Sequence, residues 1–184
     1  MLQIVPVFLG EQAQLLPGLV ACLSDTFRTP VEQHLPGFDP ETAFDASRGQ
    51  YNSRIFLGQL LRELRPGCAR VLGVTGVDLF IPVLTYVFGE AQLGGRAAVV
   101  SLHRLANERY GLPPSPPLLR RRLNKEAVHE LGHTYGLVHC HATRCVMGSS
   151  TYVEEIDLKS DRFCDRCLTE VRRTPVPSEV MRGG

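Results

Sequence analysis

The chain of 184 residues has a formal net charge of +1, and 43% of its residues are hydrophobic and 21% are charged. A charge so close to zero gives no electrostatic preference for nucleic acid or for a membrane surface, and no stretch reaches the roughly 18 consecutive apolar residues that a transmembrane helix needs. The composition is typical of one globular domain with a sizeable core, so we predict a single domain over residues 1–184.

The first quarter of the chain is predicted to contain two strands, a helix and a loop. Residues 2–9 are apolar and partly β-branched, as in a strand buried on both faces, and the N-terminus lacks the basic region and cleavage site of a secretory signal. Residues 11–23 have apolar positions at a helical period, and residues 26–34 are a candidate second strand. Residues 36–50, rich in Pro, Gly and Asp, are predicted as a loop. The missing signal favours an intracellular, cytoplasmic protein.

Four further elements follow before the middle of the chain ends. Asn52 is a candidate N-cap for an amphipathic helix over residues 53–64. Apolar runs predict strands over residues 69–75, 81–88 and 97–102, and a proline near the start of the second run favours an edge strand there. Strands that alternate with helices indicate an α/β fold.

A proline-rich break over residues 113–117 precedes the longest predicted helix, over residues 117–136. Apolar residues at steps of four give this helix its buried stripe, which consists of Leu119, Leu123, Ala127 and Leu131. Three consecutive arginines, residues 120–122, are predicted to form a solvated face and not a nucleic-acid patch. Residues 168–171 are predicted to continue a short helix, and residues 174–184 a loose tail.

The most informative pattern lies at the end of the long helix. His129 and His133 are four residues apart, so both imidazoles lie on one helix face and can bind one Zn²⁺. Glu130 points to one side, from where its carboxylate can reach a water molecule on the metal without binding the metal itself. Gly136 allows the chain to turn back and to bring His139 to the same ion. Three ligands leave a fourth position open, as in catalytic zinc sites.

A competing interpretation is an inert helix whose histidines lie on the surface or in the core. The added Gly136 and His139 at fixed spacing disfavour it, because a His-Glu-x-x-His match by itself arises by chance more often than the extended motif.

A second cluster has the pattern C-x4-C-x18-C-x2-C, formed by Cys140, Cys145, Cys164 and Cys167. Four thiolates close a tetrahedral shell around Zn²⁺ and leave no open position, so this site is predicted to be structural. The alternatives are free thiols or two disulfides, of which a reducing compartment disfavours the disulfides. The two remaining cysteines, Cys22 and Cys68, lie in apolar contexts and are predicted to be buried, inert thiols.

Residues 129–167 resemble the archaemetzincin (archaelysin) family of zinc metalloproteases. The resemblance is carried by the His-Glu-x-x-His-x-x-Gly-x-x-His core, by Met147 in the position of the metzincin Met-turn, and by four cysteines that begin directly after the third histidine. It implies a twisted, mostly parallel sheet over two helices, an antiparallel edge strand along the cleft, and a smaller C-terminal part with the Met-turn beneath the zinc. The boundary between residues 1–136 and 137–184 would fall at Gly136.

The motif and the resemblance together imply a zinc-dependent peptidase with two Zn²⁺ per chain and a peptide or protein substrate. Glu130 would be the general base of peptide-bond hydrolysis. Two alternatives stay open: a non-catalytic zinc protein that binds peptides with an occluded site, and a metal-dependent hydrolase of another bond. Neither a nucleic-acid nor a membrane partner is expected. The oligomeric state, the side-chain preference and the choice between internal cleavage and amino-terminal trimming do not follow from the sequence.

Overall fold

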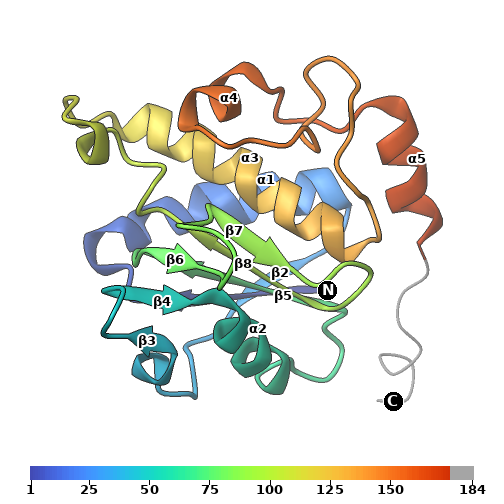
Figure 1. Ribbon diagram of the computed structural model, residues 1–184. Helices are drawn as coiled ribbons and strands as arrows, with labels where there is room; N and C mark the ends of the chain where they lie inside the picture. Colours follow the sequence, from blue (N-terminus) through green and yellow to red (C-terminus); the bar gives the residue numbers. More distant parts are fainter. Residues whose placement is uncertain (175–184) are drawn as a thin grey trace.

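A twisted sheet forms the centre of the structure, a computed structural model that describes residues 1–174 (Figure 1). Its order is β2-β1-β5-β8-β7. The strands are β1 (Leu2–Val7), β2 (Val31–Gln33), β5 (Arg70–Thr75), β8 (Ala97–Ser101) and β7 (Gly89–Ala91). Neighbours are parallel except for the β7–β8 pair, which is antiparallel. The α/β fold predicted from the alternating elements is therefore confirmed, and so is the mixed, mostly parallel sheet with an antiparallel edge strand that the resemblance implied.

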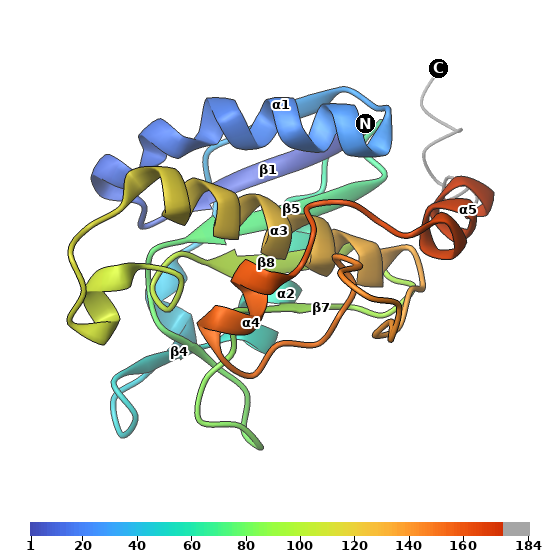
Figure 2. The ribbon, with the colours of Figure 1, turned by 90° about the horizontal axis from the view of Figure 1, so that it is seen from above.

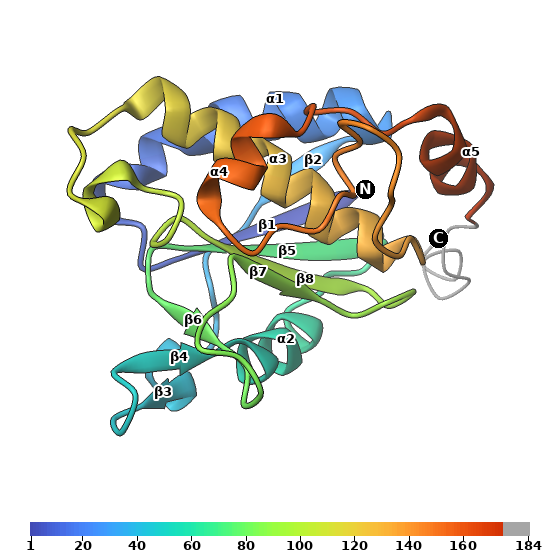
Figure 3. The ribbon, with the colours of Figure 1, turned by 45° about the horizontal axis from the view of Figure 1, so that its top comes forward.

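Helices cover both faces of this sheet. The helices α1 (Leu16–Phe27) and α3 (Pro116–Thr134) lie side by side on one face, as Figure 2 shows from above. The helix α2 (Ser53–Arg62) covers the opposite face, so the sheet lies between two helical layers (Figure 3). Asn52 caps α2 as predicted, because its side chain accepts a hydrogen bond from the backbone N–H of Arg54 at 3.1 Å.

The sequence of α3 explains its position against the sheet. Leu123, Ala127 and Leu131 recur at steps of four and are completely buried between α1 and the sheet. Full burial of each leucine contributes about 1.5–3 kcal/mol. The helix begins at Pro116, where a missing N–H does no harm, and Gly136 follows its end with φ +87°. This left-handed turn sends the chain back toward the helix that it has just left.

Two predicted strands have different limits in the structure. Residues 81–88, predicted as the edge strand, are mainly turns, and the true edge strand β7 begins one residue later. Pro82 cannot donate to a strand ladder, and Arg48 donates to the carbonyls of Leu84 and Thr85 at 2.9 and 3.2 Å, which fixes a loop there. The candidate strand 26–34 is shortened to β2, because residues 26 and 27 complete the last turn of α1.

The predicted loop 36–50 contains short regular elements. A 3₁₀ turn (Pro40–Ala43) leads into β3 (Phe44–Asp45), which pairs with β4 (Gln50–Asn52) and, through it, with β6 (Leu79–Phe80). Two more 3₁₀ turns, Gly10–Leu15 and Asn107–Tyr110, precede α1 and α3. Stretches this short carry no periodic signal, so a composition rich in turn residues could not indicate them.

The chain after α3 contains α4 (Val153–Leu158) and α5 (Asp165–Arg173), of which only the second was predicted. Arg122 joins α4 to α3 through two hydrogen bonds to Asp157, at 2.8 and 2.7 Å. Arg122 is buried, so its predicted place on a solvated face is wrong. No helix within residues 1–174 is long and apolar enough to cross a membrane. The predicted tail lies outside the described residues from position 175 onward, and the division of the chain at Gly136 stays a prediction.

Candidate active site

The structure brings the three predicted histidines together at the C-terminal end of α3. His129 and His133 belong to its last two turns, and His139 reaches them from the segment that turns back after Gly136. One ring nitrogen from each residue lies within 4.8 Å of the others. His129 is buried, His133 is half-buried and His139 is exposed, so the group opens to solvent on one side.

Two backbone carbonyls orient the first two imidazoles. His129 Nδ1 lies 2.9 Å from the Val146 carbonyl oxygen, and His133 Nδ1 lies 2.7 Å from that of Leu137. A carbonyl can only accept, so both Nδ1 atoms carry the proton and both Nε2 atoms present lone pairs. These Nε2 atoms are 3.1 Å apart. Two nitrogens bound to one tetrahedral zinc at 2.0–2.1 Å would be about 3.3 Å apart, so the donor set fits this metal.

Burial lowers the pKa of all three imidazoles, and the shift is largest at His129, where the charge of Lys159 adds to the effect of burial. The neutral imidazole is the form that binds a metal. The lowered pKa of all three imidazoles and the orientation of His129 and His133 therefore both favour metal binding.

Glu130 lies beside this group and has no ion-pair or hydrogen-bond partner among the described residues. Its side chain is buried between α3 and the edge strand, with 6% of the residue exposed. Burial raises the pKa of the Glu130 carboxyl well above its usual range, and the carboxylate of Glu126 raises it further. A buried carboxylate without a partner is costly to keep, which is typical of a functional group.

Gly89 of the edge strand makes room for this carboxylate. A Cβ atom at Gly89 would come within 2.6 Å of Glu130 Cγ and of the Val99 carbonyl oxygen. Only glycine allows this approach, because the carbonyl belongs to the β8 backbone and cannot move aside. No pattern in the sequence indicated this role for Gly89.

A cleft of about 810 Å³ runs along the histidines and Glu130. One wall consists of β7 and the loop before it, the other of residues 149–152, and the α3 side chains lie between them. Three exposed apolar side chains from separate segments line it, those of Leu84, Leu93 and Val138. The Tyr86 hydroxyl donates to the Thr151 carbonyl at 2.9 Å and joins the two walls.

The backbone of β7 is available at this cleft. The Phe88 carbonyl accepts a hydrogen bond from Ser101 N–H at 2.8 Å, and Gln92 N–H donates to the Ala97 carbonyl at 3.0 Å. Because bonding directions alternate along an antiparallel strand, the N–H and C=O groups of Gly89 and Ala91 point away from β8, toward the open edge. The sheet therefore ends at the cleft with unpaired backbone groups that an extended chain could use.

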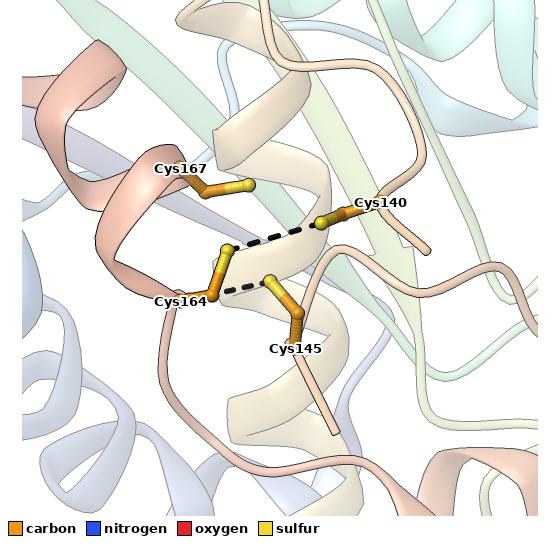
Figure 4. Close-up of side chains that lie close together, drawn as sticks. All are labelled: Cys140, Cys145, Cys164 and Cys167. Carbon is orange, nitrogen blue, oxygen red and sulfur yellow. Dashed lines mark hydrogen bonds between the residues drawn. The ribbon is translucent and has the colours of Figure 1, made fainter. Parts of the chain in front are cut away.

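The four predicted cysteines form a second group, which begins at Cys140, directly after His139 in the sequence. Their sulfur atoms lie within 4.8 Å of one another, and Figure 4 shows the four side chains pointing toward a common centre. The Sγ atoms of Cys140 and Cys164 are 3.8 Å apart. Two thiolates at about 2.3 Å from a tetrahedral zinc would have the same separation, about 3.8 Å, whereas a disulfide needs about 2.05 Å. All four thiols are free, which disfavours the disulfide alternative.

Backbone N–H groups support negative charge on these sulfurs. Ala142 N–H donates to Cys140 Sγ at 3.4 Å, and this bond, together with the three neighbouring thiols, lowers the pKa of Cys140 to about 7. The backbone N–H of Cys164 donates to Cys145 Sγ at 3.3 Å. Both contacts favour the thiolate form that zinc requires. Of the other two cysteines, Cys68 is buried as predicted and Cys22 is only half-buried.

Met147 occupies the position beneath the histidines that the Met-turn prediction requires. It is completely buried, and a Cβ atom at Gly132 would lie 2.5 Å from its sulfur. Gly132 thus lets Met147 pack directly on α3 between the turns that carry His129 and His133. The family resemblance predicted the position of Met147, but nothing in the sequence indicated Gly132, whose role depends on a contact 15 residues away in sequence.

The comparisons with known proteins agree with this geometry. A family profile described as peptidase family M54 matches residues 37–173. The chain is 46% identical over 139 residues to the archaemetzincin of Methanocaldococcus jannaschii, a match that covers 75% of each protein. The crystal structure of archaemetzincin from Methanopyrus kandleri superposes with a TM-score of 0.81 at 38% identity, covering 94% of this chain and 93% of that one. A zinc-dependent peptidase from Methanocorpusculum labreanum superposes with a TM-score of 0.80 at 28% identity, over 93% and 100% of the two chains.

Proposed function

The chain belongs to peptidase family M54 and is a zinc metallopeptidase, and from this premise we propose that Glu130 is the general base of peptide-bond hydrolysis. His129, His133 and His139 would hold the catalytic zinc. The four cysteines Cys140, Cys145, Cys164 and Cys167 would hold a structural zinc.

The observation that carries this proposal is the Glu130 carboxylate, which is buried beside the three histidines without a hydrogen-bond partner among residues 1–174. Neither zinc site needs this carboxylate as a ligand. A residue that served only stability would be more favourable as a neutral side chain at this position. Its position and its missing partner both support a role in proton transfer.

When bound, zinc supplies Lewis-acid chemistry, because it polarises the scissile carbonyl and lowers the pKa of a water molecule toward about 7. Glu130 accepts the proton of the attacking water and then donates it to the nitrogen of the leaving amine. Burial raises the pKa of the Glu130 carboxyl, which increases its affinity for the proton that it takes up from water.

The open edge of β7 supports a peptide as the substrate. An extended chain beside β7 could exchange hydrogen bonds with the outward backbone groups of Gly89 and Ala91, as an added strand. The occluded-site alternative finds no support in the described residues, because Leu84, Leu93 and Val138 line the cleft and are 51%, 62% and 63% exposed.

The proposed function can be tested with a synthetic peptide library, incubated with the zinc-loaded wild type and with Glu130→Ala and analysed by mass spectrometry. Cleavage by the wild type alone supports the proposal. Binding of peptides without cleavage would favour the non-catalytic alternative, and hydrolysis confined to ester or other non-peptide substrates would favour another hydrolase.

The two clusters predict two Zn²⁺ per chain. Elemental analysis of protein that has been supplied with zinc and freed of excess metal, with all cysteines reduced, should give a value close to two. The His133→Ala variant should give a value close to one, because it removes a ligand from one site only. A value close to one for the wild type would contradict the assignment of one of the clusters.

Gly89→Ala is expected to lower kcat by roughly tenfold while zinc content stays unchanged. The added methyl group must displace Glu130, and misplacement of a reacting group by about 1 Å can cost up to 10²-fold in rate. The matched control is Gly58→Ala in α2, where a Cβ atom meets nothing within 4 Å. Equal kcat values for the two variants would show that the contact between Gly89 and Glu130 does not position the base.

A further inference from the structure

A buried ion pair beside the cleft affects the pKa values of His129 and Glu130, but neither of its residues is a metal ligand or a proton carrier in the function proposed above. Lys159, directly after α4, donates to Glu126 Oε1 of α3 at 3.0 Å. The two side chains are only 6% and 4% exposed. The same ammonium group donates to the Gly148 carbonyl at 2.9 Å. One side chain thus joins three separate segments.

The Gly148 carbonyl belongs to the turn that orients a catalytic ligand. Gly148 N–H donates to the Cys145 carbonyl at 2.9 Å and closes this turn, and inside it lies Val146, whose carbonyl accepts from His129 Nδ1 at 2.9 Å. Glu126 lies three residues before His129 on the same helix. Lys159 therefore connects the helix that carries His129 to the turn that carries its acceptor.

The attachment of α4 to α3 does not by itself require Lys159. Lys125 donates to the carbonyls of Ile156 and Asp157 at 2.9 and 3.0 Å, and Arg122 donates two hydrogen bonds to the Asp157 carboxylate. These two residues dock α4 without touching the turn over residues 145–148. The contact that distinguishes Lys159 is its hydrogen bond to Gly148.

We propose that Lys159 is a positioning residue for the catalytic metal, because through Gly148 it holds the Val146 carbonyl against His129 Nδ1. The inference rests on the proposed zinc site of the three histidines. Carbonyls and carboxylates that bind the outer nitrogen of a metal-binding histidine typically contribute 10–100-fold to metal affinity. Lys159 contacts the turn that carries this carbonyl and does not contact the imidazole itself. Its loss should therefore weaken zinc affinity by about tenfold, the lower end of that range.

The test compares Lys159→Met, Glu126→Gln, the double variant and the control Lys125→Met. Affinity of the three-histidine site for zinc is measured with a competing chelator while the cysteine site stays filled, and kcat and KM are measured on a cleaved peptide. Lys159→Met should weaken zinc binding by about tenfold and lower kcat, with KM unchanged because Lys159 does not line the cleft. Lys125→Met should match the wild type.

The double variant separates positioning from charge balance. If Lys159 only neutralises Glu126, the double variant should regain wild-type zinc affinity, and the proposal is wrong. If Lys159 positions the turn, the loss of affinity persists although no unpaired charge remains. An equal loss in Lys125→Met, or unfolding of the double variant by circular dichroism, would also overturn the proposal, since the pair would then support the whole domain. Zinc affinity needs no substrate, so a wild type without peptidase activity would refute the proposed function and leave this test intact.

Discussion

The Glu130→Gln variant is expected to keep both zinc ions and to lose nearly all peptide hydrolysis. The substitution preserves the shape of the side chain and removes its ability to accept a proton. General base catalysis contributes on the order of 10²–10⁴-fold, so kcat should fall by that factor while KM changes little. Single-turnover measurements on a peptide that the wild type cleaves would give the rate.

This variant should not be less stable than the wild type. Glu130 is buried without a partner, so the neutral amide removes the cost of burying a charge. Its midpoint of thermal unfolding should therefore equal or exceed that of the wild type. The control is His133→Ala, which should lose metal as well as rate. Peptide cleavage by Glu130→Gln at the wild-type rate would show that the assignment of the base is wrong.

Loss of the structural zinc is expected to weaken the catalytic zinc without removing it. Cys140 follows His139 directly, so their Cα atoms are about 3.8 Å apart. Cys140 N–H also donates to the Met147 carbonyl at 2.9 Å, which ties the cysteine site to the turn beneath the histidines. His129 and His133 are held separately by α3. The third ligand should therefore become mobile while the other two stay in place, which predicts a loss of roughly 10–100-fold in affinity.

The variant for this test is Cys164→Ser with Cys167→Ser, because both residues are distant in sequence from the catalytic ligands. Catalytic zinc is titrated with a competing chelator, and circular dichroism distinguishes local loosening from global unfolding. Cys22→Ser is a matched control, since Cys22 lies outside the cluster. Unchanged catalytic affinity in a folded variant that is shown to lack the second zinc would refute the coupling.

The parts of the site that sequence predicted correctly are those fixed by local spacing. Two histidines four residues apart on a helix must share a face, and Gly136 is the residue type that a left-handed turn after the helix favours. The spacing within each cysteine pair, four residues between Cys140 and Cys145 and two between Cys164 and Cys167, likewise predicted metal ligands, and the four sulfur atoms lie together in the structure. In these cases a few neighbouring residues determine the geometry.

The parts that sequence did not predict depend on contacts between distant segments. Gly89 is required by the Glu130 side chain, and Lys159 is buried because it meets Glu126, 33 residues earlier. Arg122 belongs to a run of three arginines that is typical of a solvated face, yet it is buried and forms an ion pair with Asp157. The hydrophobic periodicity of one helix or strand cannot indicate a partner in a distant segment. The prediction of an edge strand over residues 81–88 was wrong for a similar reason, because the Arg48 side chain holds Leu84 and Thr85 in a loop.

The hydrogen bond from Tyr86 to the Thr151 carbonyl has a consequence for the rate at which substrate is admitted. It joins the two walls of the cleft across 65 residues of sequence, and an ordinary hydrogen bond contributes a net 0.5–1.5 kcal/mol, about 1 kcal/mol in a typical case. At room temperature a bond of that strength is open in roughly one molecule in six. Loop segments move in nanoseconds to microseconds, far faster than a typical turnover. This hydrogen bond between the walls should therefore break and re-form many times during each catalytic cycle.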